Sequence, residues 1–457
     1  MRLPINHKQR FMLSNEVHAR PPEPLTPSVN LTCIALTTNW PYREQDREIV
    51  VELTKQFGAT PPGIGAKHYN VMLGGFKLIW ERHTEFTRYT FVTKSNGEEP
   101  FETAAIEAAP ADWVASLPGR VIAAANAVLV DELPNGQDQN SVSERFFDDN
   151  AVIGSTITGG SATAMTDFRV HSDGFSRFLV QNRTMTPWHA GRIVQRLLEI
   201  ETYRIMALLA LPIAQELSPQ LTVSENELAE ITTAMTEAAE TEEPLLLERL
   251  TQLQANIEKG MIRGQYRFTA GNAYYDIVKS RIRELREERI VGMQTFQEFT
   301  ERRLEPALNT CRSVARRQQT LSERVDRAAQ LLSTRVDLSL EKQNQAVLES
   351  MNRRAELQLK LQQTVEGLSI AAISYYIIGL LAYFVKGVVG KQSGITPETV
   401  IAVSTPLVLL IVGAFIWRTR TRAHAPDDDA PATSVAKPTL EPTADPRGAP
   451  DAPPAKV

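Results

Sequence analysis

Two apolar runs near the C-terminus constrain this chain more than any other feature of its sequence. They cover residues 368–385 and 400–417, and neither contains a charged side chain. Each has about 18 residues, close to the shortest helix that crosses a hydrocarbon core of about 30 Å. The sequence therefore predicts a soluble part followed by a C-terminal two-helix transmembrane hairpin within residues 367–418, with spans at 368–386 and 399–417.

The charges around the two runs predict their orientation. The connection from Lys386 to Thr399 carries two lysines and one glutamate. More basic residues flank the opposite ends, namely Arg353, Arg354 and Lys360 before the first run and Arg418, Arg420 and Arg422 after the second. Because basic residues collect on the cytoplasmic side of a membrane, we expect both termini in the cytoplasm. The N-terminus has no apolar segment typical of a secretory signal, which agrees with this orientation.

The overall composition argues against several classes of function. A net charge of −5 over 457 residues does not favour nucleic-acid binding. The two cysteines, Cys33 and Cys311, are far apart and belong to no CxxC pair, so we expect reduced thiols and no disulfide. The sequence contains no HExxH and no GxxxxGK[ST] motif. We therefore expect no metal and no cofactor.

Residues 1–185 are predicted to form a cytoplasmic α/β domain with a mostly antiparallel sheet, and the fold class is α+β. After a proline-rich, irregular start to about residue 28, runs of β-branched and aromatic residues alternate with turn signals. Gly74-Gly75 is typical of a hairpin turn. The expected strands cover residues 29–37, 68–73, 76–82, 86–93, 121–130, 151–158, 162–170 and 177–181.

Residues 186–366 are predicted to form a helical domain and a stalk. Residues 188–211 have the spacing of an amphipathic helix, which Pro212 kinks or ends. Ser224 and Glu227 match a capping box and predict a helix start, and Pro244 suits the first turn of the next helix. The scarcity of proline and glycine from 272 to 367 predicts two or three long helices leading to the membrane.

The last of these helices has coiled-coil character. Apolar residues recur at alternating three- and four-residue spacing, at Leu340, Val347, Met351, Leu361, Val365 and Leu368. Arg354 and Gln358 occupy two further positions of this seam. The pattern predicts a self-associating stalk, although a helix packed on its own domain would also explain it. Residues 419–457, rich in proline, alanine and aspartate, are predicted to form a disordered cytoplasmic tail.

One short segment combines several polar groups with chemical potential. Asn15, Glu16, His18 and Arg20 lie within the sequence NEVHARP at 15–21. On an extended chain Glu16, His18 and Arg20 point the same way, so a carboxylate could orient an imidazole for proton transfer. The alternative is an N-terminal arm fixed to the domain by ion pairs and hydrogen bonds. No catalytic residue is assigned, and the four residues form a candidate functional segment.

Two other polar groups have simpler interpretations. His171 and Asp173 sit at a predicted Asp-Gly turn, which needs no functional explanation. Glu199, Glu201 and Arg204 lie in a largely apolar helix, where buried charges must be paired. We therefore expect an internal ion-pair network there and not a site.

The first apolar run carries polar groups of its own. Ser374, Tyr375 and Tyr376 lie inside it, which suggests a surface for another helix or for a pore. Tyr383 suits the membrane interface, and Lys386 can extend its charge outward. Neither run contains Asp, Glu or His, so a proton relay through the membrane is not expected.

Four stretches resemble a known family. Residues 15–21, 191–212, 273–295 and 366–387 are similar to those of the bacterial predicted membrane-anchored proteins that share domain of unknown function three-four-two-two. The resemblance covers nearly all of the chain before the tail. It implies a place in the bacterial inner membrane and a functional role for the NEVHARP segment. The family has no established activity, so the resemblance does not indicate one.

The order of the parts is also similar to that of CorA-type magnesium channels, in which a cytoplasmic α/β domain and long helices precede two C-terminal spans. In those pentamers a Gly-Met-Asn motif follows the pore-lining first span. Here the connection reads VKGVVGKQSG from residue 385, without that motif and with two lysines at the mouth. This argues against magnesium conduction.

Three functions follow as hypotheses. The first is a membrane-anchored, self-associating scaffold, whose partners are the lipid bilayer, further copies of the chain and another protein, with no nucleic acid. The second is a CorA-like oligomeric channel or a regulator derived from one. The third, less favoured, is an enzyme that uses Glu16, His18 and Arg20.

Overall fold

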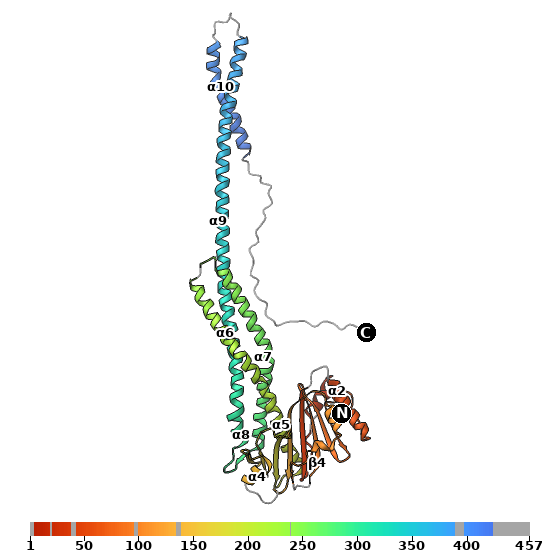
Figure 1. Cartoon of the computed structure of the whole chain (residues 1–457). Coiled ribbons are helices and arrows are strands. Elements are labelled where there is room, and N and C mark those ends of the chain that lie inside the picture. The colour runs from red at the N-terminus through yellow and green to blue at the C-terminus, as the bar shows by residue number, and fades with distance from the viewer. Residues whose placement is uncertain are drawn as a thin grey trace. The chain divides into compact units, whose positions relative to one another are not determined.

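The computed structural model describes residues 4–18, 21–37, 43–95, 99–133, 139–237, 239–388 and 397–423 (Figure 1). The chain divides into two compact units, Met1–Ser339 and Leu340–Val457. Helix α9 (Glu305–Val388) contributes its first part to the first unit and the remainder to the second. The units are described separately below.

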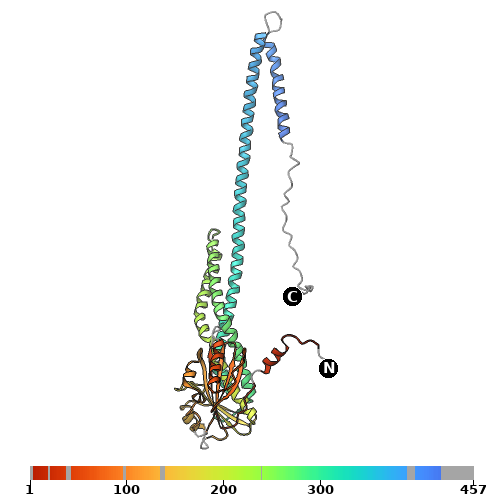
Figure 2. The same cartoon turned by 90° about the vertical axis from the view of Figure 1, so that its right-hand side faces the viewer.

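The first unit is built on one nine-stranded sheet, with the strand order β2-β3-β4-β1-β5-β8-β7-β6-β9. Neighbouring strands lie side by side across the unit (Figure 2). All named pairs are antiparallel except β5 with β8, which run parallel. The strands are β1 (Val29–Thr37), β2 (His68–Leu73), β3 (Phe76–Arg82), β4 (Phe86–Lys94), β5 (Arg120–Val130), β6 (Ile153–Ile157), β7 (Ala162–Thr166), β8 (Ser176–Asn182) and β9 (Glu288–Arg289). The predicted α+β class with a mostly antiparallel sheet is confirmed.

Local sequence explains the first hairpin of this sheet. Gly74 has φ +60, a conformation that the two-residue turn between β2 and β3 requires and that glycine adopts without strain. The turn brings Leu73 opposite Phe76, and both side chains are fully buried. They pack with Val50 and Leu53 of helix α2 (Arg43–Gln56) in one core cluster. Short segments η2 (Ala105–Ala108), α3 (Ala111–Ala115) and α4 (Gln139–Phe146) complete the sheet region.

Long helices follow the last strand of the main sheet region, and two of them, α5 and α7, pack against the sheet. Helix α5 (Pro187–Leu208) is followed by α6 (Ala210–Glu237) and α7 (Glu243–Leu285). A tight connection holds β9, α8 (Phe296–Phe299) and a π-helical turn, Thr300–Leu304, before α9. The main core cluster joins sheet residues such as Ala127 and Phe178 to Leu197 of α5 and Val278 of α7.

The helix boundaries confirm some predictions and correct others. Pro244 lies in the first turn of α7, as predicted. Helix α5 ends just before Leu209, ahead of Pro212, and Pro212 lies in the first turn of α6. Ser224 and Glu227 do not start a helix, because both lie inside α6. Packing explains the difference: Leu217, Leu221, Leu228 and Ile231 form one continuous buried face, which outweighs the local capping signal.

The second unit contains the rest of α9 and helix α10 (Pro397–Ala423). By length and composition, two helices can cross a membrane, with candidate segments inside Phe296–Phe384 and Glu398–Phe415. These segments agree with the two apolar runs at 368–385 and 400–417. Most of the predicted tail, residues 424–457, lies outside the described residues.

Candidate functional site

The candidate NEVHARP segment is only partly described. Asn15, Glu16 and His18 belong by their backbone to helix α1 (Arg10–His18), and their side chains, like all of Arg20, lie outside the described residues. The extended conformation expected up to residue 18 is wrong. The argument from an alternating, extended chain therefore does not apply to this backbone.

The last residue of this segment and the four that follow it, residues 21–25, form a strap on the first unit. The Glu23 carboxylate forms an ion pair with Lys77 of β3 and accepts a 3.3 Å hydrogen bond from Nδ2 of Asn70 in β2. The Leu25 N–H donates a 2.9 Å bond to the carbonyl of Pro187 at the start of α5. The strap therefore ties one edge of the sheet to helix α5.

A glycine makes this close approach possible. A Cβ atom built on Gly191 of α5 would lie 1.7 Å from the carbonyl oxygen of Glu23, far inside van der Waals contact. Gly191 itself is buried. A side chain at position 191 is therefore incompatible with the strap as it lies in the structure.

A small cavity of about 40 Å³ lies below the strap, enough for roughly one or two water molecules. Pro21 and Leu25 of the strap, Arg88 of β4 and Gln195 of α5 are among its lining residues. Pro21 closes the NEVHARP sequence, so the candidate segment leads directly to this cavity. The cavity as it stands has no room for a substrate.

Arg88 is the central charge of this region. Its Nε atom donates a 2.6 Å hydrogen bond to Oε2 of Glu81, and its Nη2 atom lies 2.5 Å from the same oxygen. Nη2 is also 3.8 Å from Oε1 of Glu199. The Nη1 atom is buried and has no hydrogen-bond partner among the described residues. Burial opposes the charge of Arg88, but the Glu81 and Glu199 carboxylates raise its pKa.

The acidic residues of α5 are both paired, Glu199 within the Arg88 network and Glu201 in a separate pair. Glu199 also contacts Nε of Arg281 at 2.5 Å and accepts a 3.0 Å bond from Gln195. Glu201 pairs with Arg204 at 2.8 Å and accepts from the Ser176 hydroxyl at 3.1 Å. The predicted internal ion-pair network of Glu199, Glu201 and Arg204 is confirmed, and it is wider than expected.

The thiol nearest to this network is inactive. Cys33 of β1 is 3% exposed, and burial raises its pKa to about 11, although the charge of Arg88 partly offsets this effect. A protonated thiol is a poor nucleophile at neutral pH. Cys33 is therefore a core residue and not a reactive group.

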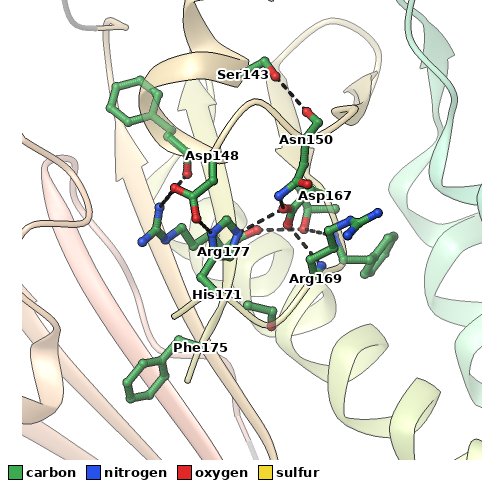
Figure 3. A network of polar contacts seen from close by, with 12 residues as sticks. Ser143, Asp148, Asn150, Asp167, Arg169, His171, Phe175 and Arg177 are labelled. Atoms are coloured by element: carbon green, nitrogen blue, oxygen red, sulfur yellow. Dashed lines mark hydrogen bonds and ion pairs between the residues drawn. The ribbon is translucent and has the colours of Figure 1, made fainter. Parts of the chain in front are cut away.

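A second polar cluster surrounds His171 (Figure 3). Its Nδ1 atom lies 2.8 Å from Oδ2 of Asp148, and its Nε2 atom lies 3.0 Å from Oδ2 of Asp167, a close contact without good hydrogen-bond direction. Asn150 donates a 3.0 Å bond to the same Asp167 oxygen. The imidazole and Asp167 are buried, whereas the Asp148 side chain is 57% exposed.

This cluster joins the loop before β6 to the loop between β7 and β8. Asp148 and Phe168 have positive φ angles of 50° and 54°, which are unfavourable for residues other than glycine. Arg177 of β8 reaches both Asp148, at 3.7 Å, and Asp173, at 3.2 Å. Both imidazole nitrogens face carboxylates, so neither is free to act on a substrate. The sequence singled out His171 and Asp173, but not Asp148 and Asp167, because their proximity depends on loop geometry.

The polar residues of the first apolar run divide into two groups. Ser374 is 4% exposed, and its hydroxyl has no hydrogen-bond partner among the described residues. Tyr375, Tyr376 and Tyr383 are 77%, 70% and 81% exposed in the single chain, and Lys386 is also exposed. The tyrosine rings are therefore available to lipid or to another chain.

Together these features define an α+β protein with a nine-stranded sheet, a long helix and two C-terminal helices able to cross a membrane. The chain belongs to the family described as protein of unknown function (DUF3422), whose profile matches residues 5–423. No curated protein matches the chain. The match supports the resemblance to the unknown-function family and gives no support to kinship with CorA-type channels.

Proposed function

We propose that this chain is a membrane-anchored, self-associating protein whose soluble part faces the cytoplasm of a bacterial cell and acts as a scaffold for another protein. The two spans at 368–386 and 399–417 are its anchor, and the helix before them is its assembly surface. Both termini are on the cytoplasmic side in this arrangement, as the flanking basic residues favour.

The observation that carries the proposal is the uncovered seam of α9. Val347 is 58% exposed, Leu361 67% and Val365 63%, although all three are large apolar residues. They stand at the 3-4 spacing of a coiled coil, and a helix packed on its own domain would bury them. A second copy of the same helix supplies the missing apolar surface.

Mass measurement of the detergent-solubilised full chain tests this proposal. We expect an oligomer for the native chain and a shift to monomer for the double variant Val347→Glu, Leu361→Glu, because paired seam positions cannot bury carboxylates. Gln363→Glu is the control, since it places one carboxylate on the opposite side of the helix. A monomeric native chain, or an oligomer that survives the double variant, contradicts the proposal.

The channel hypothesis is distinguished by transport. A CorA-like channel predicts cation flux through liposomes that contain the full chain, whereas a scaffold predicts none. The connection after residue 385 lacks Gly-Met-Asn and carries Lys386 and Lys391, which disfavours cation entry. Flux that depends on the first span would replace the scaffold proposal with the channel.

A further inference from the structure

A cleft lined mainly by basic side chains lies between helices α5 and α7 of the first unit. Its volume is about 570 Å³. Arg192 and Arg196 line it from α5, and Arg283 and Arg286 line it from the end of α7. His189, Ser280, Glu284 and Thr158 complete the lining. None of these residues takes part in the membrane anchor or the proposed assembly seam.

Helix geometry brings the basic groups together. His189, Arg192 and Arg196 are three and four residues apart, so they share one face of α5. Arg286 ends α7 in a left-handed conformation with φ 51. Thr158 lies in the turn after β6, and its N–H donates a 2.8 Å bond to the Leu285 carbonyl, which fixes this turn against the end of α7. Three distant parts of the sequence thus form one cleft.

The positive charge of the cleft is mostly uncompensated. Four arginines line it and Glu284 is the one carboxylate, which leaves a surplus of three positive charges. Oε2 of Glu284 is 2.8 Å from Nε of Arg196, and its other oxygen is 3.0 Å from Nη1 of Arg281. Within the described part of the chain, Arg192, Arg283 and Arg286 form no ion pair.

Two further observations concern the polar groups of the cleft. Burial lowers the pKa of His189, and the nearby charges of Arg192, Arg196 and Arg286 lower it further. The Thr158 hydroxyl is buried and has no hydrogen-bond partner among the described residues. The negative end of α7 accounts for arginines in its last turn, but the start of α5 does not favour His189 and Arg192.

We propose that this cleft binds a small anion with two or more negative charges, of the phosphate class. Planar guanidinium groups donate paired hydrogen bonds to phosphate oxygens, and four of them line this cleft. A phosphate monoester, a pyrophosphate or the phosphate headgroup of a lipid shares this chemistry. Neutralising the cleft also relieves the repulsion between α5 and the end of α7, so the anion stabilises the fold.

Calorimetric titration of the full chain in detergent with inorganic pyrophosphate tests the proposal. We expect binding that weakens as salt rises, at least about tenfold weaker binding for Arg192→Gln, and no measurable binding for Arg192→Gln with Arg286→Gln. Arg302→Gln removes an exposed arginine outside the cleft and is the control, with unchanged affinity. Failure of the native chain to bind, or undiminished binding by the double variant, overturns the site.

Two additional measurements sharpen this result. Pyrophosphate should raise the pKa of His189 in an NMR titration, a response that a merely structural arginine cluster does not give. Reconstitution in phosphatidylcholine nanodiscs with and without phosphatidic acid identifies the source. Loss of pyrophosphate binding with phosphatidic acid assigns the cleft to a lipid headgroup, and unchanged binding assigns it to a soluble phosphate. An unmoved His189 pKa contradicts the proposal.

Discussion

The two units of this chain differ in how far their apolar side chains are buried. In the first unit Trp80, Phe91 and Leu197 are fully buried, and even the charge of Arg88 is enclosed and paired. In the second unit Leu361, Tyr375 and Leu410 are 67%, 77% and 70% exposed. A unit that buries its own core can fold in water, whereas helices with bare apolar faces need lipid or another chain. The contrast separates a unit that buries its own core from one whose apolar helices are exposed in the single chain.

Removing the second unit should have the largest effect on membrane association and solubility, and little effect on the fold of the first unit. Leu332 is the last residue of α9 in the core of the first unit. We expect a chain cut after Ser339 to leave the membrane fraction and remain soluble, with a Tm close to that of the first unit in the full chain. Fractionation and circular dichroism measure both properties.

A shorter cut provides the control for this comparison. Ending the chain after Cys311 removes Val314, Leu321, Val325 and Leu332 from the core and should prevent cooperative folding. If the chain cut after Ser339 aggregates or stays in the membrane fraction, the division into a self-sufficient unit and an anchor is wrong.

Within the first unit, Arg88→Met should cause the next largest loss. Its side chain is 4% exposed, and its removal leaves Glu81 buried without its main partner. We expect a loss of about 3–5 kcal/mol in the free energy of unfolding, measured by urea titration. Arg263→Met breaks a pair with Glu216 in which both side chains are about half exposed, and should cost about 0.5 kcal/mol. Equal losses would show that the Arg88 network is not a structural centre.

The strands and the two apolar runs were predictable because each depends on local pattern. Strand β1 was predicted with the bounds that it has, because β-branched residues recur along Val29–Thr37. Turn glycines such as Gly74 marked the hairpins. The apolar runs at 368–385 and 400–417 stand out by composition alone, and no tertiary contact is needed to recognise them.

Other features were not predictable because they depend on distant contacts. The parallel pairing of β5 with β8 and the position of Ser224 inside α6 follow from packing and not from local sequence. The same holds for the candidate sites. Asp148 and Asp167 contact His171 because of the loop geometry. Arg192 and Arg286 line one cleft because α5 lies beside the end of α7.

Glycine-to-alanine substitutions add one methyl group in each unit, so their effects on stability can be compared. Gly191→Ala forces the strap away from α5 and should cost about 1–3 kcal/mol in urea unfolding, by overpacking. Gly367→Ala, in the second unit, meets no atom within 4 Å. There the methyl group only favours the helix, so the unfolding of the first unit should not change. A neutral Gly191→Ala would show that the strap does not depend on this close approach.

The smallest expected effect concerns the exposed edge of the His171 cluster. The hydrogen bond with His171, assisted by the charges of His171 and Arg177, lowers the pKa of Asp148 below its ordinary value of 3.8. Around and below that pH the unfolded chain binds more protons at this position than the folded chain. The contribution of Asp148 to stability is therefore complete above about pH 5 and is lost as the pH falls below 4.

Because the Asp148 side chain is 57% exposed, solvent screening limits this contribution to about 0.5 kcal/mol or less. Asp148→Asn should lower the Tm slightly at pH 6, and the difference from the native chain should shrink between pH 4 and pH 2.5, a window set by the ordinary carboxyl pKa. A difference that is constant with pH would show that Asp148 acts through loop geometry alone. The same substitution should leave the oligomeric state unchanged, because the cluster and the exposed seam of α9 belong to different units.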